Sequence, residues 1–164
     1  MDDLTTLRFS DGGAVATITL ARPDLRNRMD EIAHAELESV FRSLRDRRDI
    51  RAVVFAAEGK AFSAGGDFDL MRRGNTDPDA RRKIIDEGWS LLEAMLHVPQ
   101  PIVAAVQGDA VGLGATLAFA CDAVVTHPTC RIFDPHVGVG LVAGDGGCLL
   151  WPAHAGIRSR RVSR

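Results

Sequence analysis

Cysteine is scarce in this chain, and the three cysteines present, Cys121, Cys130 and Cys148, lie far apart. An odd number at such spacing excludes a metal knuckle and favours free thiols in a reducing compartment. No His-Glu-x-x-His motif or cluster of cysteine and histidine occurs elsewhere. The sequence therefore predicts no metal site.

Long apolar runs are also missing. No segment approaches the ~20 apolar residues that a membrane-spanning helix needs. The N-terminus carries Asp2 and Asp3 in place of the apolar stretch of a signal peptide. We therefore expect a cytoplasmic protein with no membrane partner.

Neither sign of charge is in excess, since the formal net charge is −2 and the arginines are mixed with acidic residues. This balance argues against nucleic acid as a partner. Only the last seven residues are strongly basic. Such a tail can contact RNA or acidic lipid, but the commoner interpretation is a solvated terminus. With 164 residues, 46% of them hydrophobic, the chain is long enough for one domain with its own core.

Strand-like and helix-like patterns alternate along the chain. Residues 6–20 form a predicted hairpin, and Asp30 is placed to cap a helix with apolar residues at helical spacing. Because strands alternate with helices, we predict an α/β fold with a mainly parallel sheet. The further predicted strands are 50–56, 102–106, 123–126 and 131–133, and the apolar residues of the predicted helices are Ala33, Leu37, Val40, Phe41 and Leu44, then Ile85, Trp89, Leu92, Met95 and Leu96, then residues 113–120.

The end of the sequence departs from this pattern. Another helix is predicted to begin near Gly146, but the chain then turns to an arginine-rich segment. We therefore divide the chain into a core of residues 1–152 and an atypical basic tail of residues 153–164, which we expect to be disordered. The lone histidines His34 and His97 fall in helical patterns and are expected at the surface or at the rim of the site.

Two glycine-rich segments each follow a predicted strand, at residues 62–68 and 107–116. Glycine allows backbone dihedrals and close ligand approach that other residues do not. Free amide N–H groups at such junctions can stabilise an oxygen atom that becomes anionic, with a contribution of roughly 3 kcal/mol each. The predicted donors are Ala64 and one residue among Gly112, Leu113 and Gly114. The alternative is that both segments are ordinary tight turns.

A third segment, residues 134–147, places His136 and Asp145 in a glycine-rich run before a predicted helix. Histidine is the commonest general acid or base, and a nearby carboxylate can orient it or act as its partner. The alternative makes Asp145 a helix cap and His136 an ordinary loop residue.

Together these segments resemble the enoyl-CoA hydratase/isomerase superfamily, also called the crotonase family. The matching runs cover most of the chain in the family's order: Arg22-Pro23-Asp24-Leu25-Arg26-Asn27, Phe62-Ser63-Ala64-Gly65-Gly66-Asp67-Phe68, Gln107 to Gly114, and Pro135 to Gly147. The resemblance implies a crotonase-like core with a ββα spiral, without the C-terminal helical region that the family carries.

The resemblance also implies an acyl-CoA thioester as the partner. The thioester carbonyl would lie in an oxyanion hole made by the N–H groups of Ala64 and Leu113. The substrate with its coenzyme A would contact Leu25, Ala64, Gly65, Gly66, Asp67 and Gly112. No bound cofactor is implied, because coenzyme A is part of the substrate. Family members form homotrimers, often paired into hexamers.

Two departures bear on the reaction. Where hydrating members carry two glutamates, this chain has Thr116 and His136. Threonine cannot serve as a carboxylate base. A pair of His136 and Asp145 is similar to what some members use for other chemistry, including hydrolysis of a carbon–carbon bond beside a carbonyl. The family reaction is therefore left open, with His136 and Asp145 as the predicted catalytic residues.

Three further hypotheses compete with this one. Ser63 in Phe62-Ser63-Ala64-Gly65 is reminiscent of a nucleophile elbow, with His127, His136 or His154 as partner. The Gly112-x-Gly114 run partly matches a dinucleotide fingerprint but lacks its third glycine. Finally, the absent family helices raise the hypothesis of a truncated, catalytically incompetent fragment, or of a frameshifted reading.

Overall fold

The computed structural model describes the backbone of residues 3–159 and the side chains of residues 3–154. Its larger sheet has five strands in the order β1-β2-β3-β5-β7. The first two strands pair antiparallel as the predicted hairpin, and all other neighbours in this sheet are parallel. The strands are β1 (Leu7–Asp11), β2 (Val15–Leu20), β3 (Ala52–Ala57), β5 (Ile102–Val106) and β7 (Ala123–Thr126).

A smaller parallel sheet contains β4 (Ala61–Ser63), β6 (Asp109–Val111) and β8 (Ile132–Phe133), in that order. From β3 onward the chain repeats one sequence of events: a strand in the larger sheet, a strand in the smaller sheet, then a helix. In the second unit the helix is α4 (Leu113–Phe119), which follows β6, and in the third unit it is α5 (Gly147–Ser159), which follows β8. The predicted alternation and parallel sheet are therefore confirmed.

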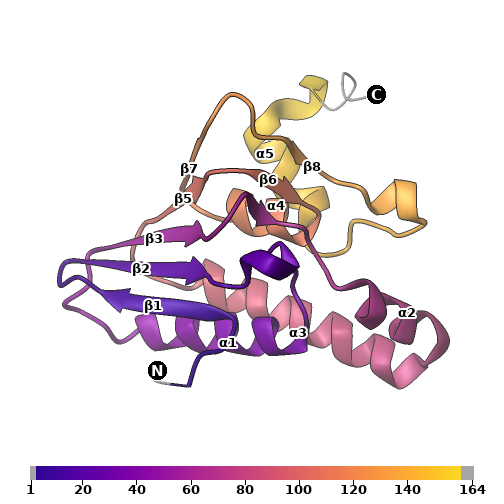
Figure 1. Cartoon of the computed structure of the whole chain (residues 1–164), viewed down its shortest axis with the longest axis horizontal. Helices are drawn as coiled ribbons and strands as arrows, with labels where there is room; N and C mark the ends of the chain where they lie inside the picture. The colour runs from indigo at the N-terminus through magenta and orange to yellow at the C-terminus, as the bar shows by residue number, and fades with distance from the viewer. Residues whose placement is uncertain (1–2, 160–164) are drawn as a thin grey trace.

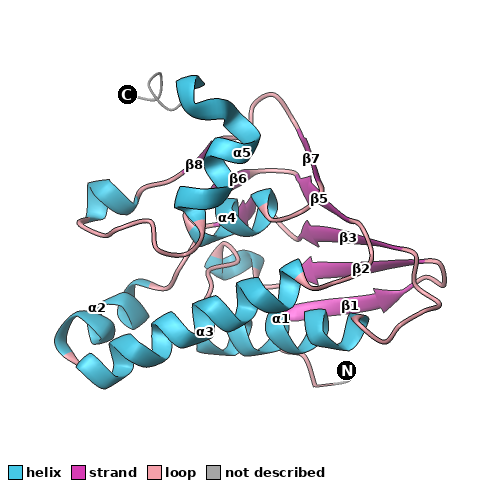
Figure 2. Ribbon diagram, turned by 180° about the vertical axis from the view of Figure 1, so that it is seen from behind, coloured by secondary structure: helices cyan, strands magenta, loops and turns pink. Residues whose placement is uncertain are grey.

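Helices α1 (Glu31–Leu44) and α3 (Pro78–Leu96) lie side by side against the larger sheet, as Figures 1 and 2 show. Asp30 caps α1 as predicted, since its carboxylate accepts a hydrogen bond from the Ala33 N–H at 3.0 Å. The predicted apolar stripe of α1 is buried along its whole length. Phe41 of α1 packs edge-on against Phe55 of β3, with ring centroids 6.1 Å apart. These contacts fix α1 on the sheet.

The helices differ from the sequence pattern in two places. Residues 68–76 form a further helix, α2 (Phe68–Thr76), because the Asp67 carboxylate accepts from the first free N–H groups. In α3, Ile85, Trp89 and Leu96 are more than half exposed. They are exposed because α3 turns its other face, around Leu91, Ala94 and Met95, toward the core.

The final helix also differs from the expectation of an irregular tail. Helix α5 continues from Gly147 past residue 152 to Ser159, so residues 153–159 are helical. Packing on α4 explains this continuation, because Trp151 meets the Phe119 ring edge-on and His154 stacks on the same ring at 5.3 Å. Residues 160–164, the rest of the predicted basic tail, lie outside the described residues.

Candidate functional site

One cavity of about 740 Å³ collects nearly all of the predicted site residues. Its walls come from both glycine-rich segments, from α2 and α3, and from the loop before α5. The volume is in the range of ordinary ligand sites. Leu25 does not line this cavity and is 42% exposed on the surface. The predicted residues that line it are Ala64, Gly65, Gly66, Asp67, Gly112, Leu113, His136 and Asp145.

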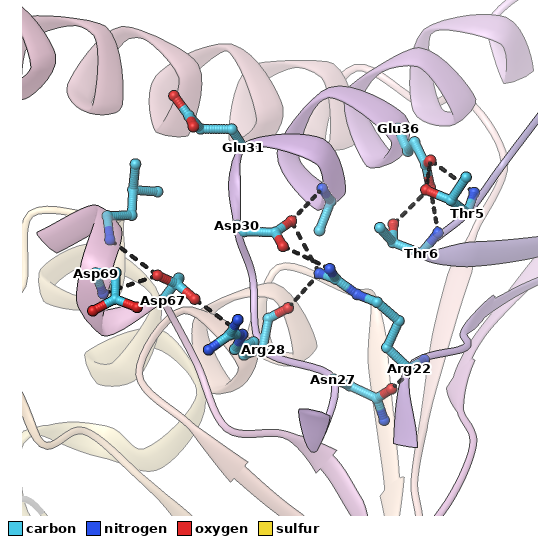
Figure 3. Close-up of polar contacts among 12 residues, drawn as sticks. Thr5, Thr6, Arg22, Asn27, Arg28, Asp30, Glu31, Glu36, Asp67 and Asp69 are labelled. Atoms are coloured by element: carbon cyan, nitrogen blue, oxygen red, sulfur yellow. Dashed lines mark hydrogen bonds and ion pairs between the residues drawn. The ribbon is translucent and has the colours of Figure 1, made fainter. Parts of the chain in front are cut away.

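The loop from Arg22 to Asp30 anchors the first glycine-rich segment (Figure 3). The Arg22 guanidinium donates to the Asp30 carboxylate and to the Arg28 carbonyl. Asn27 is buried, and its amide donates to the carbonyls of Glu58 and of Ala61 in β4. This loop therefore holds the strand that leads into the site.

The Ser63 side chain serves this anchoring as well. It is fully buried, and its hydroxyl donates to the Asn27 carbonyl at 2.8 Å and accepts from the Gly65 N–H at 3.1 Å. A nucleophilic serine needs access to substrate and a basic partner. Within the described residues, Ser63 has neither, so the nucleophile-elbow hypothesis does not fit the structure.

The predicted donor Ala64 is already engaged. Its N–H donates to the Arg26 carbonyl at 2.9 Å, so it is not free for a ligand. The structure instead frees Gly66. Met29 bonds to the residues on either side of Gly66, through Met29 N–H to Gly65 carbonyl and Asp67 N–H to Met29 carbonyl. In such a parallel bridge the central residue turns its own N–H away, and within residues 3–159 the Gly66 N–H has no hydrogen-bond partner.

The second glycine-rich segment touches the first. Gly65 has φ +85°, and a β-carbon there would lie 2.7 Å from the Val111 carbonyl oxygen and 3.7 Å from the Gly112 Cα atom. Gly66 is the residue after Gly65, and Leu113 is the residue after Gly112. Both Gly66 and Leu113 line the cavity. The Gly112 N–H donates to the Phe133 carbonyl, whereas Leu113 opens α4, where N–H groups have no partner inside the helix. Two residues whose amides have no partner within residues 3–159, Gly66 and Leu113, therefore line the cavity next to the contact between the two glycine-rich segments.

A histidine between two carboxylates stands on another wall. Nδ1 of the His136 ring is hydrogen-bonded to the Asp134 carboxylate, which also accepts from the His136 backbone N–H at 2.8 Å. On the other side of the ring, Nε2 lies 3.6 Å from Asp145 Oδ2. That oxygen is buried and, among the described residues, has no hydrogen-bond partner. The arrangement suits proton transfer, because Asp134 fixes the ring while Nε2 faces a second carboxylate.

Sequence reasoning underused Asp134 and misplaced His34. Asp134 stands two residues before His136, at the spacing of a side chain that accepts from the backbone N–H two residues on, and that signal was available. His34 was expected at the surface or at the rim of the site, but it is only 5% exposed and lines the cavity. Burial lowers the pKa of His34 below 6.5, although the carboxylates of Glu87, Asp30 and Glu31 oppose the shift.

Comparison with known proteins identifies the fold and its family. The family model described as enoyl-CoA hydratase/isomerase matches residues 10–161. The chain belongs to the enoyl-CoA hydratase/isomerase family. A crystal structure of an enoyl-CoA hydratase/isomerase from Mycobacterium paratuberculosis superposes with a TM-score of 0.89 at 40% identity, covering 97% of this chain and 64% of that one. The predicted crotonase-like fold is thus confirmed.

Curated relatives agree with this assignment. A probable enoyl-CoA hydratase of Rhizobium meliloti is 32% identical over 142 residues, which are 87% of this chain and 54% of the relative. A short-chain-enoyl-CoA hydratase of Clostridium acetobutylicum is 29% identical over 146 residues, 88% of this chain and 55% of the relative. The family member described here therefore spans about half the length of these relatives.

No helix within residues 3–159 is long and apolar enough to cross a membrane. Among the described side chains, no group of three or more histidine, cysteine, aspartate or glutamate residues is placed to hold a metal ion.

Proposed function

We propose that this family member processes acyl thioesters of coenzyme A. In this proposal the thioester carbonyl lies between the N–H groups of Gly66 and Leu113, and His136 with Asp145 transfers protons. One observation carries the proposal: the cavity is lined by a carboxylate-flanked histidine and by Gly66 and Leu113, whose backbone amides have no hydrogen-bond partner among the described residues. The amides stabilise the enolate that forms when a proton leaves or a nucleophile adds, because they are fixed donors in a low-dielectric site.

Gly66 replaces Ala64 as the proposed donor, because the Ala64 N–H already donates to the Arg26 carbonyl. Ala64, Gly65, Asp67 and Gly112 keep a role in shaping the wall. Asp67 acts through structure, since its side chain is 7% exposed, caps α2 and pairs with Arg28 at 3.0 Å. Leu25 lies outside the cavity, so its proposed contact is with the coenzyme A part of the substrate at the surface.

In the proposed mechanism, Asp134 holds Nδ1 of His136 and thereby aims Nε2 toward Asp145 and the cavity. A proton moves between the acyl carbon next to the thioester and one of these two groups. The negative charge that develops on the thioester oxygen is held by the two amides. Every group used belongs to the chain itself, and coenzyme A enters only as part of the substrate.

The amide donors can be tested although they belong to the backbone. Leu113→Pro removes one N–H at the first helical position, where proline is tolerated. Leu113→Ala keeps that N–H and controls for the lost side chain. We expect kcat on acyl-CoA substrates to fall about 10²–10³-fold in Leu113→Pro relative to Leu113→Ala. Equal activity of the two variants would contradict the role of this amide.

The proton-transfer role is tested by His136→Ala, assayed against a panel of enoyl- and β-keto-acyl thioesters. A positioned acid or base contributes about 10²–10⁴-fold, and a loss of that size is expected. The absence of both turnover and coenzyme A binding in the unaltered chain would contradict the enzyme proposal and favour a non-catalytic fragment.

The Asp134–His136 contact favours a second candidate within the same family, hydrolysis of a carbon–carbon bond beside a carbonyl. A histidine held by a carboxylate is suited to activating water. Turnover of β-keto thioesters without turnover of enoyl thioesters would select this candidate. Assembly into trimers or hexamers and a cytoplasmic location stay predictions from the family resemblance and the composition.

A further inference from the structure

The thioether of Met71 lies against the proposed amide donor Gly66. A β-carbon at Gly66 would lie 2.6 Å from Met71 Cε, so the Met71 methyl group packs directly on the Gly66 Cα atom. Met71 is in the first turn of α2, where its N–H donates to the Asp67 carbonyl. Long side chains in helices turn back toward the N-terminus of the helix, which explains why this one covers the residue before the cap. Both Met71 and Gly66 line the cavity.

Met71 is also the most accessible methionine among residues 3–154. Met29, which borders the same cavity, and Met95 are 1% and 2% exposed, whereas Met71 is only partly buried. Oxidation of methionine to the sulfoxide requires that the oxidant reach the sulfur atom. Within the described side chains, a peroxide should therefore oxidise Met71 first.

Oxidation changes the hydrogen-bonding character of this side chain. The sulfur lone pair attacks one oxygen of hydrogen peroxide, the oxygen–oxygen bond breaks, and the other oxygen leaves as water with both protons. Sulfur is thereby oxidised by two electrons and the peroxide is reduced. The thioether is only a weak acceptor, whereas the sulfoxide is polar and its oxygen carries partial negative charge. The donor beside it is the Gly66 N–H, which has no partner within residues 3–159.

The Met71 side chain is long enough for its sulfoxide oxygen to reach this amide. Since a carbon–carbon bond is about 1.5 Å long, Met71 Cε lies at most about 4 Å from Gly66 Cα. The amide nitrogen is bonded to that Cα atom, and the sulfoxide oxygen would be bonded to the sulfur next to Cε. Three rotatable bonds let the methionine side chain adjust. The Gly66 backbone stays in place meanwhile, because Met29 holds Gly65 and Asp67 on either side of it.

We propose that Met71 is a redox-modification site: a peroxide converts it to the sulfoxide, whose oxygen accepts from the Gly66 N–H and occupies the position of the thioester oxygen. The inference rests on the proposed acyl-CoA function. Oxidation at this one side chain then inhibits the site from within. The inhibition is reversible, because methionine sulfoxide reductases convert the sulfoxide back to the thioether.

The modification itself is tested by peptide mass mapping. The unaltered chain is treated with hydrogen peroxide and then with dithiothreitol, which reduces disulfides and sulfenic acids of cysteine but leaves methionine sulfoxide. We expect Met71 to gain one oxygen about 10-fold or more faster than Met29 and Met95, because they are buried. Saturating octanoyl-CoA, which has the thioester but no reactive double bond, should slow the oxidation of Met71 by covering it.

The consequence is measured as kcat/KM on enoyl- and β-keto-acyl thioesters and as the Kd of octanoyl-CoA, before and after peroxide treatment. Loss of one amide donor costs about 10²–10³-fold, so kcat/KM of the oxidised chain should fall at least about 10-fold and recover with the reductase. Met71→Leu should show no peroxide effect, and this before-to-after ratio cancels any effect of the substitution itself. The matched control Met95→Leu keeps Met71 and should stay sensitive. Met71→Gln, which supplies an amide oxygen, should lower kcat/KM without peroxide.

Three results would overturn the inference and leave the proposed function standing. One is oxidation of Met71 no faster than that of Met95. Another is equal inhibition of the unaltered chain and of Met71→Leu by peroxide. The third is complete oxidation of Met71 with unchanged kcat/KM and unchanged Kd of octanoyl-CoA. If the untreated chain neither turns over any of the thioesters nor binds octanoyl-CoA, the proposed function fails, and the inhibition fails with it.

Discussion

The contact between Gly114 and Ser63 controls how the two free amides are placed. An alanine β-carbon at Gly114 would lie 2.5 Å from Ser63 Cβ and 2.7 Å from Ser63 Oγ. Carbon atoms normally approach to about 3.5 Å, so Gly114→Ala requires a relative movement of about 1 Å. Ser63 cannot rotate away without losing its bonds to Asn27 and Gly65. Helix α4 must therefore move away from β4.

The magnitude follows from two opposing effects. Overpacking a close contact costs about 1–3 kcal/mol, whereas alanine in place of glycine favours a helix by about 0.5–1 kcal/mol. We expect the free energy of unfolding of Gly114→Ala to fall by about 1 kcal/mol, the difference between the midpoints of these two ranges. Because Leu113 moves with α4 by about 1 Å relative to Gly66, turnover of acyl-CoA should fall by about 10².

The assay is denaturant unfolding followed by circular dichroism, together with acyl-CoA turnover. Gly138→Ala is the matched control, because no atom lies within 4 Å of the added carbon and Gly138 does not line the cavity. Adding Ser63→Gly to Gly114→Ala removes both clashing atoms, so the double variant should be more stable than the sum of the single changes predicts, by about 1 kcal/mol. Unchanged or increased stability of Gly114→Ala would refute this account of the contact.

The remaining predictions concern burial and capping. The pKa of His34 is lowered below 6.5 in the folded chain but not in the unfolded chain, so protonation favours unfolding and the free energy of unfolding falls as the pH drops below 6.5. His34→Leu should flatten the dependence of the unfolding free energy on pH between 7 and 5. An unchanged slope would exclude His34 as the source of that dependence. Burial raises the pKa of Cys121 to about 12, whereas Cys148 is exposed. A disulfide reagent should therefore modify Cys148 in the native chain and Cys121 only after unfolding. Equal rates of modification of the two cysteines in the native chain would contradict this expectation. Asp67→Ala should lower the free energy of unfolding by about 1–2 kcal/mol through loss of the α2 cap, and Asp67→Asn, which keeps the cap but not the charge pairing with Arg28, should lose less in the same measurement.

The sequence alone was sufficient for features that depend on local pattern. The helical spacing from Ala33 to Leu44 and the cap at Asp30 predicted α1, since periodic burial and capping are encoded within a few residues of each other. The glycine-rich junctions and the position of Leu113 at the start of α4 were found in the same way. The apolar spacing in α3 did not predict which of its side chains are buried. Packing against α1 determines which apolar face of α3 is buried, and that contact is not encoded in the local sequence.

Only the tertiary structure decided which groups are free to act. Ala64 and Gly66 are two residues apart in one loop, and the choice between them depends on hydrogen bonds to Arg26 and Met29, some forty residues earlier. Likewise, the side chains of Thr116, Asp134 and Asp145 all come close to Gly147 only because α4 packs against α5. Whether a polar atom has a partner is a property of distant segments brought together, so sequence pattern could identify the loops of the site but not their free donors.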